Sequence, residues 1–110
     1  MTSADHLEVF LNGSSWCEGL VGVRQHDNSF WLSGSNATWT QAAADLVCQQ
    51  MHCGSAKDHD SWDSSEIPGT NLWPREYKCS SKEKSLFDCP SSKQTDNSTI
   101  AFVRCAGGCV

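Results

Sequence analysis

The stretch TWTQAAADLVCQQMHCG, residues Thr38–Gly54, decides the fold of this chain. Its middle is rich in good helix formers, and its apolar side chains recur at four-residue spacing, which predicts one amphipathic helix. Thr40 is a suitable N-cap, because its hydroxyl can accept a hydrogen bond from a free N–H of the first turn. A capping box of Thr38 with Gln41 is the alternative. Gly54 is expected to end the helix in a left-handed conformation.

Cysteine content is the most unusual feature of the composition. Seven cysteines occur in 110 residues, and two of them, Cys48 and Cys53, lie at the end of the predicted helix. Small extracellular domains with few large apolar residues rely on disulfides. A zinc site requires close cysteine pairs such as C-x2-C, which the spacings in this chain do not provide. The pattern therefore favours disulfides and an oxidising, extracellular environment.

Three N-x-[ST] sequons support an extracellular glycoprotein, with glycosylation predicted at Asn12, Asn36 and Asn97. Residues 1–10 lack the apolar core of a signal peptide, and no apolar run is long enough to span a membrane. We therefore expect the parent protein to supply its signal and anchor outside these 110 residues. The net charge of −5 argues against a nucleic-acid partner, because phosphate binding requires a basic surface.

Short strands are predicted along the rest of the chain. Alternating apolar residues indicate strands at residues 6–11, 19–24, 30–32, 71–79 and 100–105. The polar segments 55–70 and 90–99 are interpreted as surface loops. One helix among five or six short strands predicts an α+β fold, in which a small curved antiparallel sheet cradles the helix. Trp16, Trp31 and Trp39 are expected in its core.

Four stretches together resemble a scavenger receptor cysteine-rich domain over residues 7–106, with residues 1–6 and 107–110 as flanking tails. The first strand runs from Leu7 through N-G-S to a cysteine and glycine. Trp39 precedes VCQQMHCG by the family's spacing, CSSKEKSLFDCP resembles its hairpin, and V-R-C resembles its closing strand. Four matches in the right order are far more specific than any one of them.

This resemblance implies the disulfides Cys17–Cys53, Cys48–Cys105 and Cys79–Cys89. Six cysteines allow fifteen pairings, so the sequence alone does not choose among them. The family's fuller pattern has a fourth bridge, whose cysteines are replaced here by Ser35 and a residue near Thr95, which makes this a six-cysteine variant. Cys109 has no counterpart and is interpreted as free or as a feature of the chain's end, with intermolecular pairing as the alternative.

Many domains of this family bind a cation through two adjacent acids and a hairpin glutamate. Glu83 stands at the hairpin position, but Asn36 and Ala37 stand where the acid pair belongs. A hard cation needs several oxygen ligands, so we predict no metal site and no cofactor, with Glu83 as the remnant of one. The acids of residues 58–66 are interpreted as a solvated loop.

The resemblance implies a non-enzymatic extracellular module of an immune-cell surface receptor that binds a protein or microbial ligand. Its parent is expected to be membrane-anchored with tandem domains, while this domain itself does not insert into the membrane. Trp62, Trp73 and Arg75 are the predicted ligand-contacting residues, because aromatic side chains flanked by charge often anchor interfaces. The alternatives are an accessory domain of an extracellular serine protease and a glycosylated structural spacer in a receptor ectodomain.

The disulfide assignment makes a prediction that mass spectrometry can check. Reduction should raise the intact mass by about six hydrogens, two for each of three bonds. An unchanged mass would argue for free thiols or a metal site instead.

Overall fold

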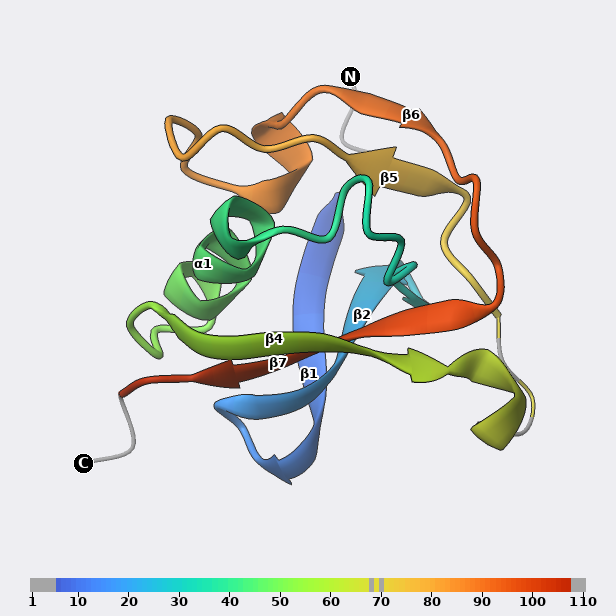
Figure 1. Ribbon diagram of the computed structural model, residues 1–110, viewed down its shortest axis with the longest axis horizontal. Coiled ribbons are helices and arrows are strands. Elements are labelled where there is room, and N and C mark those ends of the chain that lie inside the picture. Colours follow the sequence, from blue (N-terminus) through green and yellow to red (C-terminus); the bar gives the residue numbers. More distant parts are fainter. Residues whose placement is uncertain (1–5, 68, 70, 108–110) are drawn as a thin grey trace.

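The computed structural model describes residues 6–67, 69 and 71–107, which form strands around one α-helix (Figure 1). The strands are β1 (Leu7–Ser15), β2 (Glu18–Gln25), β3 (Asn28–Trp31), β4 (Ala56–Asp63), β5 (Arg75–Tyr77), β6 (Ser91–Lys93) and β7 (Thr99–Cys105). The helices are α1 (Gln41–Gln50) and the short 3-10 turns η2 (Ser64–Glu66) and η3 (Leu86–Asp88). The α+β fold predicted from the sequence is confirmed.

The main sheet is antiparallel and has the strand order β1-β2-β7-β4, with β3 paired to β2 beside this path. The first and last thirds of the chain therefore meet at its centre, where Leu20 pairs with Phe102. The strands β5 and β6 form a separate two-stranded ribbon. The described residues contain no helix that is both long and apolar enough to cross a bilayer.

Helix α1 begins as the sequence predicts, but it ends at Gln50, and the left-handed residue directly after its C-cap Met51 is His52 and not Gly54. Thr40 is extended and its hydroxyl accepts a hydrogen bond from the N–H of Ala43, which makes it the N-cap. The capping-box alternative is wrong, because the Thr38 hydroxyl instead donates to Glu76. Past the last turn, Gly54 adopts a left-handed conformation with φ of 78°, where a side chain would be strained.

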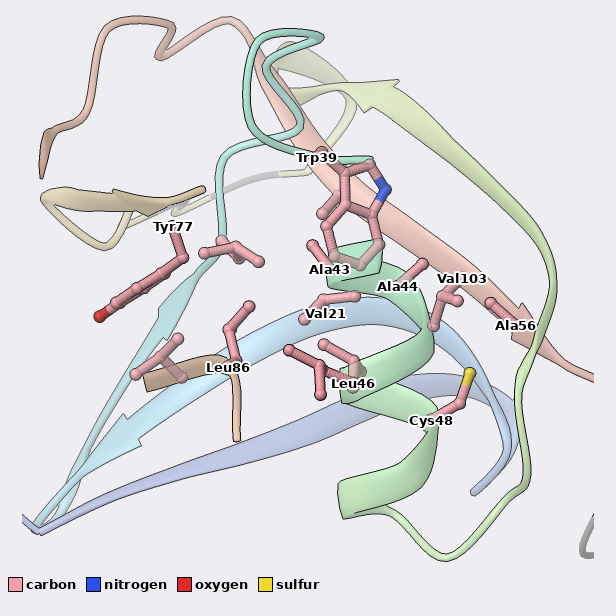
Figure 2. Close-up of a cluster of buried hydrophobic side chains, with 14 of the residues drawn as sticks. Val21, Trp39, Ala43, Ala44, Leu46, Cys48, Ala56, Tyr77, Leu86 and Val103 are labelled. Carbon is pink, nitrogen blue, oxygen red and sulfur yellow. The ribbon is translucent and has the colours of Figure 1, made fainter. Parts of the chain in front are cut away.

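A single apolar core lies between α1 and one face of the main sheet. Figure 2 shows Ala43, Ala44 and Leu46 of α1 pointing toward Val21 of β2 and Val103 of β7. The small alanine side chains let the helix approach the sheet closely. Branched side chains on the strands fill the remaining space, as close packing requires.

Three disulfides hold this core together: Cys17–Cys53, Cys48–Cys105 and Cys79–Cys89. The first two join the end of α1 to the β1–β2 hairpin and to the end of β7. They close sequence separations of 36 and 57 residues. A disulfide that closes a loop of this length lowers the conformational entropy of the unfolded chain, which stabilises the folded state by about 4 kcal/mol for each bond.

A buried glutamate connects the segments that carry a fourth disulfide in the family's fuller pattern. Glu76 is 2% exposed, and its carboxylate accepts hydrogen bonds from the Thr38 hydroxyl at 3.2 Å and from the Thr95 N–H at 2.7 Å. Nearby, the Ser33 hydroxyl donates to the Asp96 carbonyl at 2.7 Å. Hydrogen bonds therefore link the chain before α1 to the chain before β7.

Several sequence-based expectations are wrong in detail. Trp16 is 67% exposed at the β1–β2 hairpin and is not a core residue, whereas Trp39 is 5% exposed and Trp31 is half-buried. Residues 56–63, interpreted as a loop, form strand β4. Aspartate is rare in strands, but β4 is stabilised here by its pairing along β7.

Removing the Glu76 charge tests its role. We expect Glu76→Gln to lower the free energy of unfolding by about 2–3 kcal/mol, because it replaces a carboxylate that accepts three hydrogen bonds in a buried site. Chemical denaturation measures this loss. Glu66→Gln is the matched control, since Glu66 is exposed; equal stabilities for the two variants would contradict the assigned role.

Candidate ligand-binding face

The main sheet has two faces of different character. One packs against α1 through residues such as Val21 and Val103. Side chains alternate along a strand, so the residues between them point the other way. We call this second side the open face, because none of the described helices packs on it. It carries Phe10, Leu20, Trp31, Trp62, Ile100 and Phe102, placed together by the strand registers.

The open face has a groove along β4 and β7, with a volume of about 350 Å³. We call it the β4–β7 groove. It is lined by Asp58, His59, Asp60, Trp62, Phe102 and Arg104. The Trp62 ring is stacked on Phe102 with centroids 5.2 Å apart and planes 17° apart, yet remains 42% exposed. A large apolar surface is therefore held rigidly at the rim.

Arg104 supplies the positive charge of the groove. Its guanidinium lies 3.4 Å from the Glu18 carboxylate and 3.3 Å from that of Asp58, and it sits 5.9 Å above the Phe102 ring centre. Exposed ion pairs contribute little to stability, so their effect is to hold Arg104 in place. Because two carboxylates surround one guanidinium and Asp60 adds a third acid, the groove is net acidic.

The groove has a firm floor. On the α1 side, the Trp39 Nε1–H donates to the Asp60 carbonyl at 2.9 Å and to the Phe102 carbonyl at 3.2 Å. One buried indole thus clamps β4 to β7 beneath the groove. The His59 and Trp39 rings lie nearly perpendicular to each other, with their centroids 6.3 Å apart. At the end of β4, the Asp63 carboxylate accepts the Ser65 N–H, which lowers the pKa of Asp63.

A second aromatic pair lies across the open face on β1 and β3. Phe10 and Trp31 have ring centroids 5.8 Å apart, and the guanidinium of Arg24 lies 4.7 Å from the Phe10 centroid. Gly22 lies directly beneath the Phe10 ring, where any side chain would collide with it. This glycine therefore allows the ring to lie flat on the sheet.

The three predicted ligand-contacting residues are not brought together. Trp62 lies in the β4–β7 groove. Trp73 is 7% exposed and its Nε1–H donates to the Tyr77 hydroxyl at 2.8 Å, so its assignment to an exposed ligand face is wrong. Burial in this pair raises the pKa of Tyr77. Arg75 is exposed on β5, where it donates to the Ser91 hydroxyl, and is not among the residues that line the groove.

Sequence reasoning missed the residues that make Trp62 part of a surface. Phe102 and Arg104 alternate with buried Ala101 and Val103, a period-two signal that could have assigned them to the opposite side. The missing information was the strand register, since segment 56–63 was interpreted as a loop. Without β4, Trp62 has no predictable neighbours.

No cation site is assembled in the part of the chain that the structure describes. The Glu83 carboxylate accepts hydrogen bonds from the Ser80 N–H at 3.1 Å and the Ser80 hydroxyl at 3.0 Å. The backbone bond favours the ionised form, so the pKa of Glu83 is lowered. Glu83 therefore closes its own hairpin. The prediction for Cys109 lies outside the described residues.

The chain belongs to the scavenger receptor cysteine-rich domain family, whose model matches residues 11–106. This fold, with its disulfides, defines an extracellular domain of the receptor type. Human "CD5 antigen-like" is 33% identical over 81 residues, which are 73% of this chain and 23% of the relative. Mouse T-cell differentiation antigen CD6 is 31% identical over 98 residues, 82% of this chain and 13% of the relative.

Solved structures agree with this assignment. A crystal structure of CD5 domain III, described as a group B scavenger cysteine-rich receptor fold, has 25% identity and a TM-score of 0.58, with coverage of 94% of this chain and 98% of that one. The third such domain of murine neurotrypsin has a TM-score of 0.66 at 20% identity, with coverage of 91% and 96%, and shows the fold alone. The chain spans less than a quarter of the human relative.

The hairpin carboxylate provides a pH-dependent prediction. Because the pKa of Glu83 is lowered from 4.5, its contribution to stability is present above 4.5 and is lost as the pH falls through the folded value. An NMR titration should place the Glu83 midpoint below 4.5, and added Ca²⁺ should not move it. Glu83→Gln should remove this part of the pH dependence; a Ca²⁺-dependent shift would contradict our interpretation.

Proposed function

We propose that this domain is a non-enzymatic ligand-binding module of an immune-cell surface receptor and that its ligand docks in the β4–β7 groove. The observation that carries the proposal is the exposed Trp62 ring, fixed on Phe102 above a floor clamped by Trp39. Such rigid aromatic anchors contribute most of the binding energy at many interfaces. A preorganised surface also loses little conformational entropy on binding.

The groove favours a partner that presents lysine or arginine side chains. A cation lying on the Trp62 face gains a cation–π interaction, and the carboxylates of Asp58 and Asp60 lie on the same side of β4. The net charge of −5 adds long-range attraction for a basic surface. The ligand class that fits is therefore a basic patch on an extracellular protein or on a microbial surface protein.

The chemistry of the groove supports binding over catalysis. Its guanidinium is already held by two carboxylates, and the groove is shallow and open to water. General acid–base chemistry needs a proton donor or acceptor positioned against a bound substrate. A solvated row of mutually paired charges is better suited to recognition.

Two exposed tryptophans allow a matched test. The domain is passed over immobilised extracellular ectodomains of differing isoelectric point, with heparin as a polyanion control, and binding is measured by surface plasmon resonance. Trp62→Ala should lower the affinity for the basic ligands about 30-fold, the loss expected when a hot-spot residue worth about 2 kcal/mol is removed. Trp16→Ala should not, because Trp16 lies at the β1–β2 hairpin, outside the groove.

The Asp60→Asn variant separates the contribution of the groove's negative charge to binding from that of the Trp62 ring. It should slow association and reduce the salt dependence of binding while leaving the fold intact, because Asp60 is exposed. Preference for heparin, or loss of binding only in Trp16→Ala, would contradict the groove as the docking site. An absence of binding to every ectodomain would favour the structural spacer.

A further inference from the structure

The register of the main sheet places a glycosylation sequon in line with the groove. Asn12 of β1 pairs with Leu20 of β2, Leu20 pairs with Phe102 of β7, and Phe102 pairs with Asp60 of β4. Directly paired residues point to the same face of a sheet. Asn12, Leu20, Phe102 and Asp60 therefore form one straight row across the open face.

Asn12 is free to carry a glycan at the start of this row. It is exposed, while its neighbour Leu11 packs against the core from the other face of the sheet. It is followed by Gly13 and Ser14, which complete the sequon. The strand thus directs a sugar chain from Asn12 over the open face and away from α1.

The row offers a suitable surface for the inner sugars. The Phe102 ring lies two strands from Asn12, roughly 10 Å away at ordinary strand spacing, and an asparagine side chain with two sugar rings is longer than this. Pyranose rings carry C–H groups on one face, and these pack on the electron-rich face or the edge of aromatic rings. Leu20, between the two residues, is only 7% exposed, so the first sugar crosses above it and reaches the half-buried Phe102 ring.

We propose that an N-linked glycan on Asn12 lies across the open face of the sheet, with its inner N-acetylglucosamine residues packed on the exposed part of Phe102. This glycan is the layer that covers the β1–β2–β7 part of the face. It leaves Trp62 uncovered, because Trp62 lies on β4 in the neighbouring row, where it pairs with Ile100 and stacks on the far side of Phe102.

The proposal has a consequence that rests on the proposed function. A glycan lying on Phe102 forms the inner wall of the β4–β7 groove, so the occupancy of Asn12 controls how much of the groove a ligand can enter. Domains with and without this glycan then differ in affinity for the same basic partner.

The test uses the domain secreted from a glycosylating eukaryotic host. Peptide mass spectrometry measures occupancy at Asn12, and NMR records nuclear Overhauser contacts between the sugars and the Phe102 ring. Ser14→Ala removes the sequon while keeping Asn12, and Asn97→Gln removes a sequon whose loop contacts Ser64 at the end of β4. Melting temperatures are compared in the Phe102 and Phe102→Leu backgrounds.

We expect Asn12 to be occupied, with sugar contacts to Phe102. Ser14→Ala should lower the melting temperature by about 3–5 °C, the shift that a modest contact energy gives in a small domain. Phe102→Leu should abolish most of this difference, while Asn97→Gln should show no such coupling. An unoccupied Asn12, or a loss that is the same in both backgrounds, overturns the proposal. Either result leaves the Trp62 binding test valid, since that test compares Trp62→Ala and Trp16→Ala with the unchanged domain in material of the same Asn12 occupancy.

Discussion

The structure depends on the attachment of one short helix to two adjacent strands, β2 and β7, that are far apart in the sequence. Cys48 and Cys53 lie at the end of α1, and they are bonded to Cys105 at the end of β7 and to Cys17 just before β2. These two partners are neighbours, since the Cys105 N–H donates to the Cys17 carbonyl at 2.9 Å. A ten-residue helix is only marginally stable in water by itself, and its small alanine face buries little area. The covalent bonds hold it where those alanines can pack. The rigidity of the groove follows, because Trp39 precedes this helix and clamps β4 to β7 from below.

The helix and the disulfide framework could be predicted because their signals are local. Capping by Thr40 and the apolar spacing of α1 are properties of consecutive residues, and the cysteine spacing resembled a known family. The site could be predicted only in part, because it depends on strand register. Trp62 was identified, but Phe102 and Arg104 become its neighbours only when β4 pairs with β7. Trp16 and Trp73 were placed wrongly because a tryptophan in a short strand or turn gives no sequence signal for which side it faces.

The chain also shows how a lost covalent link can be replaced by polar contacts. Where the fuller family pattern has a disulfide, Glu76 accepts hydrogen bonds from both flanking segments, and Ser33 adds a bond to the Asp96 carbonyl. A buried carboxylate is costly unless its partners are in place. The same contacts that join the segments therefore also specify their positions, which a single apolar contact would not do.

The order of the cysteines along the chain has a mechanical consequence. A force that pulls the two ends apart passes from Cys17 to Cys53, back along the chain to Cys48, and from there to Cys105. Residues 18–47 and 54–104 lie in closed loops outside this path, so tension bypasses α1 almost entirely, together with β2, β4 and β7. Only β1, which precedes Cys17, can be peeled from the sheet. With this disulfide connectivity, the domain keeps its groove intact while the molecule that contains it is stretched.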